Sequence, residues 1–504
     1  MNRNFLSLMV FVLLLTVSCK KESVNEPTIN DNPRKYGFRV TIDDQSQANL
    51  PRRRGGSMTT MTHMAGLYTI WDLGDQIRVN GRDFVVDTFE GDRKDVYFSS
   101  IDARGDGPYY AFYPKELQNP NNWNPAGNDG KPFGTLPGTY RHDPDHVSLP
   151  MYGRSNVGGQ DTNLVFTNIC GVLRIMIPSG VTKITVSEIY SQSKLWGSFE
   201  IVNVRGVEYA EMKSSGEGDN TITILPKVGE TYLDDSRAVY VPLPSTGRST
   251  YTLQLTLYGL NNSVILDKTI GDNRYGFTVE ANKFYSVCAD DNLLPRRVKI
   301  SNNPAWYVYF AKGNLVYNST TGEFSLENGQ DVVQSSWDPT HVSHFFYCDD
   351  VTKAAAATFD LANLSQTLFC DYEHRIEVNG SHGFYCLNKN EWNSLIANNS
   401  HVSKTLSTAS GSSQFFIFAA NASSYNSVDN CTQDGVLCLP QNLYYRTDDG
   451  INTSETTGRL WTSTDSDDQS DLQAYCFDFS SSSPSVIQND KANGYCIRLV
   501  KDAD

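Results

Sequence analysis

The stretch that decides the fold is KYGFRVTIDDQSQANLPRRRGGS, residues 35–57. Its first half alternates apolar and polar residues, with Phe38, Val40 and Ile42 on one side. That two-residue period is typical of a strand that buries one face against a core. The sequence therefore predicts that the folded part of the chain begins with a half-buried β-strand.

A basic loop follows this strand. Arg52, Arg53 and Arg54 run into Gly55 and Gly56, and a glycine-flanked basic triplet is accessible to trypsin-like proteases. Cleavage between Arg54 and Gly55 would detach the first strand from its sheet. The sheet would then expose unpaired N–H and C=O groups and an apolar slot, which a strand of another chain can fill. The alternative is a solvated basic loop between two strands, and these residues taken alone favour it.

The composition indicates a globular, β-rich protein. The chain has 504 residues, of which 27 are Tyr and 24 are Phe, and its formal net charge is −15. Aromatic residues favour strands, and a chain of this length suits about three domains. The sequence shows no broad basic face, which argues against a nucleic acid as the partner.

The N-terminus resembles the export signal of a bacterial lipoprotein. Arg3 precedes an apolar run, residues 5–17, that is too short to span a bilayer and leads to Cys19. We expect residues 1–19 to be the signal and the thiol of Cys19 to be acylated; the alternative is an ordinary secretory signal with an incidental cysteine. Residues 20–34 are polar and predict a tether. Lys20-Lys21-Glu22 resembles the charged export tag of surface lipoproteins, so we expect a surface-exposed lipoprotein of the cell outer membrane.

Residues 35–290 carry almost only strand signals. Turn residues separate short alternating runs, as in antiparallel β-sandwiches. A single sandwich needs about 100 residues, so we expect two of them, over residues 35–160 and 161–290. The predicted strands are residues 83–89, 95–100, 164–177, 221–225, 238–243, 251–257 and 283–288.

The chain changes character after a predicted linker at residues 291–297. An alanine-rich run at residues 353–364 favours a helix. Two apolar runs near the end, residues 474–479 and 494–500, flank a serine-rich segment and predict a closing hairpin. Strands, short helices and long loops together predict an α+β domain over residues 298–504.

The clearest helix signal lies in this last domain. Asn388 and Glu391 have the spacing of a capping box, in which each side chain bonds a free backbone N–H of the first turn. Trp392, Leu395 and Ile396 follow on one face. We therefore expect a short helix that begins after Asn388 and buries its tryptophan.

Enzyme and metal signatures are sparse. The sequence contains no H-E-x-x-H, G-x-S-x-G or P-loop motif. His341 and His344, near Cys348, are too few for a recognisable metal site. Arg104-Gly-Asp106 is the tripeptide that animal integrins bind, but tripeptides recur by chance.

One acidic loop could supply oxygen ligands to calcium. It lacks the glycine and the distal glutamate of an EF-hand, so the interpretation as a calcium site rests on carboxylate density alone. The candidate ligands are Asp465, Asp467, Asp468 and Asp471.

Several motifs occur in order between residues 35 and 290. They are Trp71-Asp-Leu-Gly-Asp75, Tyr110-Ala-Phe-Tyr-Pro114, Leu149-Pro-Met151 and the run from Asn168 to Leu173. Together they resemble the fimbrillin family of type V pilus subunits. The resemblance implies two β-sandwich domains of transthyretin-like topology. It also implies that an arginine-specific protease removes the first strand and that a neighbouring subunit's donor strand fills the groove, which makes cleavage between Arg54 and Gly55 the favoured interpretation.

A second set of motifs covers residues 298–502. They are Val308-Tyr-Phe-Ala-Lys-Gly-Asn-Leu315, Glu391-Trp392, Leu460-Trp-Thr-Ser-Thr464 and Gly494-Tyr-Cys-Ile-Arg-Leu-Val500. They resemble a C-type-lectin-like module whose relatives include the formylglycine-generating enzyme fold. The resemblance implies long loops that can bind calcium or a glycan, which adds weight to the acidic loop.

The cysteines gather in the second half of the chain. Seven of the ten lie after residue 340, and none of their positions matches a redox pair that the formylglycine-generating relatives would imply. Cys476 and Cys496 lie on the two strands expected to close the domain, where a cross-strand disulfide fits. We therefore expect no enzyme activity.

Three functions remain open at this point. The favoured one is a pilus tip adhesin whose partners are other subunits, an arginine-specific protease and a host or bacterial surface glycan or protein. The tip position is expected because residues 498–500 close the lectin-like module and cannot be donated. The alternatives are an anchored lipoprotein that captures glycans without polymerising, and an enzyme on the formylglycine-generating fold.

Overall fold

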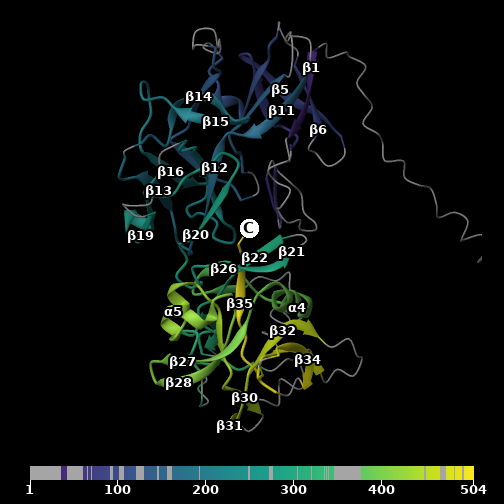
Figure 1. Ribbon diagram of the computed structural model, residues 1–504, viewed down its shortest axis with the longest axis vertical. Helices are drawn as coiled ribbons and strands as arrows, with labels where there is room; N and C mark the ends of the chain where they lie inside the picture. Colours follow the sequence, from purple (N-terminus) through teal and green to yellow (C-terminus); the bar gives the residue numbers. More distant parts are fainter. Residues whose placement is uncertain are drawn as a thin grey trace, which may run out of the picture.

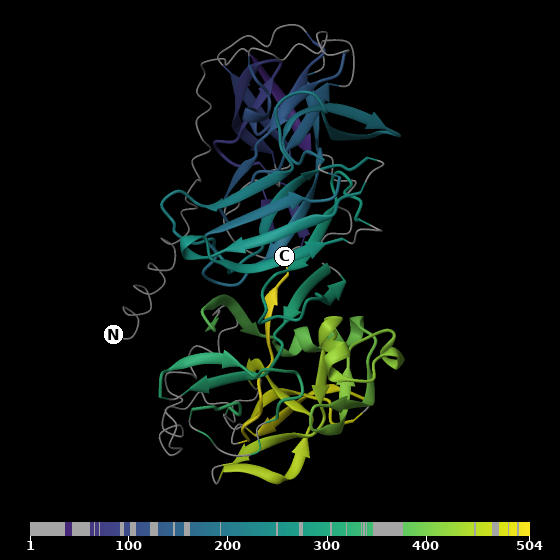
Figure 2. The ribbon, with the colours of Figure 1, turned by 90° about the vertical axis from the view of Figure 1, so that its left-hand side faces the viewer.

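The computed structural model describes residues 36–42, 61–64, 66–69 and 71–503. Within the last range it leaves out residues 91–94, 101–106, 121–129, 145–146, 156–161, 192, 248–249, 272–275, 303–304, 319, 334, 336–337, 339, 346–375, 448–449, 466–472, 482 and 491–492. Figures 1 and 2 show an elongated, mainly β molecule in which the described N-terminal and C-terminal parts are stacked along the long axis. Its described helices are all too short or too polar to cross a membrane.

The first unit closes on itself. Its sheet wraps into a seven-stranded barrel in the order β1-β11-β10-β7-β4-β5-β6. Trp71 fills the centre, with edge-to-face contacts to Phe98, Tyr113 and Phe166 at centroid distances of 5.0, 5.2 and 5.4 Å. The strands are β1 (Tyr36–Ile42), β4 (Gln76–Val79), β5 (Arg82–Glu90), β6 (Asp95–Ser100), β7 (Tyr110–Tyr113), β10 (Met151–Ser155) and β11 (Asn163–Asn168); β2 (Met61–Met64) and β3 (Gly66–Thr69) form a separate hairpin.

The second unit is a sandwich. A five-stranded sheet, β19-β18-β13-β16-β9, and a three-stranded sheet, β17-β12-β20, contribute to one apolar core, and β15-β14-β8 form a third sheet beside them. The alternating residues Ile184 and Val186 on one side, and Leu173 and Ile175 on the other, are all fully buried in that core. The strands are β8 (Phe133–Leu136), β9 (Thr139–His142), β12 (Cys170–Met176), β13 (Lys183–Glu188), β14 (Gly197–Val204), β15 (Val207–Met212), β16 (Thr221–Pro226), β17 (Val239–Pro244), β18 (Leu253–Tyr258), β19 (Val264–Ile270) and β20 (Phe284–Cys288).

The boundary between these two units is not the expected break at residue 160. The predicted strand over residues 164–177 is two strands that part at Ile169, and β11 stays in the barrel while β12 enters the sandwich. Earlier strands also cross over, since β8 pairs with β14 and β9 pairs in parallel with β16. Periodicity locates a strand, but its partner is set by long-range packing, so the sequence pattern could not place this boundary.

The third unit is α+β. Its central sheet has the order β21-β22-β35-β26-β25, and smaller sheets and two short helices surround it. The elements are β21 (Val298–Asn302), β22 (Ala305–Phe310), β23 (Leu315–Asn318), β24 (Glu323–Leu326), β25 (Ile376–Val378), β26 (Ser381–Cys386), α4 (Lys389–Asn398), β27 (Val402–Thr408), β28 (Gly411–Ile417), α5 (Val428–Gln433), β29 (Cys438–Pro440), β30 (Leu443–Thr447), β31 (Gly450–Thr457), β32 (Arg459–Asp465), β33 (Gln473–Asp478), β34 (Ser485–Asp490) and β35 (Leu499–Asp502). Short 3₁₀ turns lie at Lys115–Leu117, Leu260–Asn262 and Ala422–Ser424.

The predicted capped helix is confirmed. α4 begins after Asn388, whose side chain accepts from the N–H groups of Asn390 and Glu391, while the Glu391 carboxylate accepts from the N–H of Asn388. Trp392 is fully buried and stacks on Phe477 at a centroid distance of 4.3 Å. The helix expected at residues 353–364 lies outside the described residues.

The predicted closing hairpin is wrong. Residues 474–479 pair through β33 with β32 and β34, so the serine-rich segment turns the chain into β34. The last strand, β35, lies in another sheet, between β22 and β26. Residues 485–490 and 494–500 are both short runs that could pair with β33. Residues 485–490 are nearer in the sequence, across the serine-rich turn, and they form β34 beside it.

The segment expected to be a linker, residues 291–297, is packed between the units. Leu293 and Leu294 are buried in two different apolar cores. Beside them the ammonium of Lys501 lies 3.6 Å from the carboxylate of Asp290, with both side chains fully buried. The hydroxyl of Ser381 donates to the same carboxylate at 3.1 Å. These contacts fix the end of β35 to the residues that follow the last sandwich strand. Figures 1 and 2 show the chain end after β35 next to the sandwich.

We predict that Lys501→Met destabilises the junction strongly. The substitution preserves the apolar stem but leaves the Asp290 charge buried without its cation, which costs about 3–5 kcal/mol. Urea unfolding followed by tryptophan fluorescence measures the loss. The control is Lys131→Met, which breaks an exposed pair with Glu200 and costs about 0–1 kcal/mol. Equal, small effects of the two substitutions would contradict the prediction.

Candidate functional site

The first strand is held on both sides. β1 pairs antiparallel with β6, from Tyr36 opposite Ser100 to Thr41 opposite Asp95. On its other edge it pairs in parallel with β11, and the register there runs from Arg39 opposite Asn163. Without β1 the barrel would therefore open along two unpaired strand edges.

The side chains of β1 complete the barrel core. Phe38 and Val40 are fully buried. The Phe38 ring makes edge contacts with Phe84 and Tyr109, at centroid distances of 5.0 and 4.9 Å. Burial of each apolar side chain contributes about 1.5–3 kcal/mol. A chain that occupied this slot in place of β1 would need apolar residues two positions apart.

The opposite face of β1 is polar, as the alternation predicts. Arg39, between Phe38 and Val40, is exposed. The hydroxyl of Thr41 donates to the carboxylate of Asp95 on the neighbouring strand. The predicted half-buried strand is thus confirmed, and Phe38 and Val40 face the core as the alternation indicates.

Most of the sequence-predicted site residues lie outside the described residues. These are the lipidation residue Cys19, the basic triplet with the Arg54–Gly55 bond, the Arg104-Gly-Asp106 tripeptide, and Asp467, Asp468 and Asp471. Asp465 is described only as the last residue of β32. The cleavage and calcium hypotheses therefore stay predictions.

The two histidines have different surroundings in the structure. The Nε2 atom of His341 lies 2.9 Å from a carboxylate oxygen of Glu327, whereas His344 is buried. Cys348 lies outside the described residues. Within the part of the chain that the structure describes, no three His, Cys, Asp or Glu side chains are grouped to hold a metal ion.

The proposed disulfide partners are placed differently from the expectation. Cys476 pairs across the sheet with Trp461 of β32, and Cys496 forms a bridge with Leu460 on the other edge of that strand. Both thiols are free and buried, and burial raises the pKa of each to about 12. The disulfide prediction assumes that the strands of Cys476 and Cys496 pair with each other. In the structure each of them pairs with β32 instead.

Trp461 is also part of the core. Its ring is fully buried, and its indole N–H donates to the carbonyl of Phe345 at 2.7 Å. A sugar therefore cannot stack on this ring. At this residue, the motif that resembles a lectin-like module therefore belongs to the buried core and not to an exposed binding surface.

The last strand is locked in place. β35 is a central strand, with Val500 opposite both Phe310 and Tyr385. Arg498, just before it, is fully buried and donates to Asn314 and to the carbonyls of Ala311 and Lys312, each at 3.1 Å. Withdrawal of this strand would break two ladders and expose a buried guanidinium.

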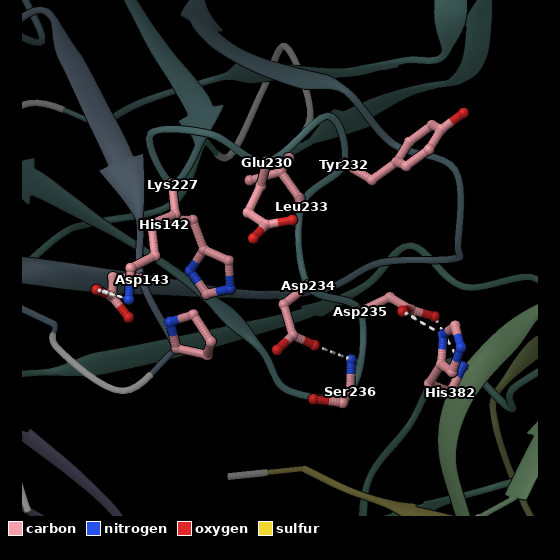
Figure 3. A pocket seen from close by; sticks show the side chains of 11 residues that line it. His142, Asp143, Lys227, Glu230, Tyr232, Leu233, Asp234, Asp235, Ser236 and His382 are labelled. Atoms are coloured by element: carbon pink, nitrogen blue, oxygen red, sulfur yellow. Dashed lines mark hydrogen bonds and ion pairs between the residues drawn. The ribbon is translucent and has the colours of Figure 1, made fainter.

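A cavity at the junction of the second and third units was missed from the sequence. Its volume is about 560 Å³. Figure 3 shows residues of the loop between β16 and β17 on one side and His382 of β26 on the other. His382 bonds Asp235 twice, through its backbone N–H at 2.8 Å and its Nδ1 atom at 2.9 Å. Only the fold brings these residues together, so no local motif announces the site.

Comparison with known proteins gives distant likenesses. No family model matches the sequence, and no curated protein matches it. A fimbrial protein from Bacteroides ovatus is 11% identical, with a TM-score of 0.25, over 92% of this chain and 99% of that one. A C-terminally truncated form of the tip fimbrial protein Mfa3 from Porphyromonas gingivalis is 10% identical, with a TM-score of 0.23, over 50% of this chain and 94% of that one.

We predict that Phe38→Ala loosens the N-terminal barrel. Loss of the ring removes its contacts with Phe84 and Tyr109 and leaves a cavity, at a cost of about 3–5 kcal/mol. Hydrogen exchange of β6 and β11 in the full chain measures the effect strand by strand. Tyr190→Ala, an aromatic truncation at a side chain that is 70% exposed, is the control and should leave this exchange unchanged. Unaltered exchange in Phe38→Ala would show that β1 does not hold the barrel closed.

Proposed function

We propose that this protein is a pilus subunit assembled by exchange of its first strand. The observation that carries the proposal is the two-sided pairing of β1, which fills a slot between β6 and β11 with Phe38 and Val40. The basic triplet Arg52–Arg54 follows this strand in the sequence. Cleavage there removes β1 and any lipid on Cys19 together, and a strand from a neighbouring subunit then fills the slot. The ordered fimbrillin-like motifs support the same account.

The proposal further places this subunit at the pilus tip. A stalk subunit needs a slot that receives a strand and a strand that it can give. Here β35 is a central strand held by the buried Asp290–Lys501 pair. A subunit whose final described strand is fixed in this way can receive but cannot give it. At a tip, the C-terminal α+β unit, which resembles a C-type-lectin-like module, is free to contact a surface glycan or protein.

We predict that replacement of Arg52, Arg53 and Arg54 by Ala blocks maturation. Without the cleavage site β1 stays in its slot, so no donor strand can enter. Cell fractionation and mass spectrometry should find the intact precursor in the membrane, with lipid on Cys19, and none in filaments. The control replaces Arg296 and Arg297, the dibasic site between the second and third units, and should be processed normally. Normal incorporation of the triple variant would refute the mechanism.

We predict that the C-terminal unit is found only at filament ends. Immunogold labelling with antibody against residues 298–504 tests this on purified filaments. Label along the whole shaft would contradict the tip position but not strand exchange. Label on the cell surface with no filament at all would favour the alternative, an anchored lipoprotein that captures glycans without polymerising.

A further inference from the structure

The cavity between the second and third units has an unbalanced charge. Four carboxylates line it, those of Asp143, Glu230, Asp234 and Asp235, with the lysine Lys227. Lys227 pairs with Asp143 at 2.7 Å. Asp235 is bonded to His382, as described above. Arg237 also acts electrostatically on Asp234. Lys227 and Arg237 therefore offset only part of the charge of the four carboxylates, and the cavity lining keeps an excess of negative charge.

Asp234 stays ionised in this position. Burial raises the pKa of its carboxyl, but hydrogen bonds from Ser236 outweigh that effect and hold the pKa below its usual value. The backbone N–H of Ser236 donates to this carboxylate at 2.8 Å. The negative charge is therefore present at neutral pH.

His142 adds an acceptor without a donor. Its side chain lies at the end of β9, is only 6% exposed, and has no hydrogen-bond partner for its Nε2 atom. Burial lowers the pKa of the imidazole, so the ring is neutral at pH 7. A hydrogen bond to the backbone of Asp234 raises the pKa of the ring, but burial is the larger effect. A buried nitrogen of this kind costs about 1–3 kcal/mol unless a ligand supplies an N–H or O–H. Figure 3 shows the ring among the side chains of Glu230 and Asp234.

The geometry points to an organic cation as the ligand: we propose that the cavity lined by His142, Glu230 and Asp234 binds a primary ammonium group. A metal ion needs at least three converging ligands, and the described residues form no such group here. The cavity of about 560 Å³ instead accommodates a group larger than an ion. An ammonium carries a positive charge and N–H donors, which suit a cavity lined by carboxylates and by one nitrogen that lacks a hydrogen-bond partner. This inference does not depend on the proposed assembly.

Two sources share this chemistry, a lysine side chain and an amino sugar. Isothermal titration of the full chain at pH 7 distinguishes them with Nα-acetyl-lysine-N-methylamide and with glucosamine. The neutral counterparts are the Nε-acetylated lysine derivative and N-acetylglucosamine. We expect at least one charged probe to bind about five-fold or more tightly than its neutral counterpart, and the probe that binds identifies the source. Equal affinity for charged and neutral probes, or no saturable binding of either amine, would overturn the proposal.

Variants assign the binding to this cavity. Glu230→Gln removes a charge from an exposed residue without disturbing the core, and we expect it to weaken binding of the amine about five-fold. His142→Leu removes the buried acceptor and should have a larger effect. Glu211→Gln, the same charge change on the exposed strand β15, is the matched control and should bind as the unchanged chain does. If Glu230→Gln binds the amine as tightly as Glu211→Gln, the cavity is not the site.

Discussion

The structure depends on the closure of the N-terminal barrel by β1. This strand supplies backbone partners to β6 and β11 at once and fills the core with Phe38 and Val40. It is also the first strand described, and the intervening segment that links it to the rest contains the basic triplet. If the connector is cleaved as proposed, β1 would hold the fold until cleavage and then leave it. The contacts of β1 would then also define what a replacing strand must supply.

The other end of the described chain is built in the opposite way. All four residues of β35 are buried, and Lys501 is neutralised by Asp290 of the preceding unit. A buried ion pair is costly to separate, because each charge would lose its partner in a medium of low polarity. The C-terminal unit is therefore fixed to the sandwich, while its outer loops lie away from that junction.

The sequence predicted those features that depend on neighbouring residues. Alternation located β1, β5 and β6 of the barrel and five strands of the sandwich, β12, β16, β17, β18 and β20. The Asn388–Glu391 capping box located α4. It failed where the partner is far along the chain. β8 and β9 join strands of the second unit, and the indole of Trp461 bonds the carbonyl of Phe345. The closing hairpin failed for a different reason, because the nearer run, β34, is the partner of β33. The cavity at His142 and His382 was invisible for the same reason, since no local pattern brings these residues together.

β1 and β35 differ in a way that would decide which of them can be exchanged. β1 presents only alternate side chains to the core, carries no buried charge in the described register, and could be replaced by any strand with apolar residues at the same spacing. β35 has buried residues on both faces and a buried lysine that needs one particular carboxylate. A foreign strand could therefore satisfy the slot of β1 but not the position of β35. In the proposed assembly, this asymmetry, more than the presence of a free edge, would make β1 exchangeable and β35 permanent.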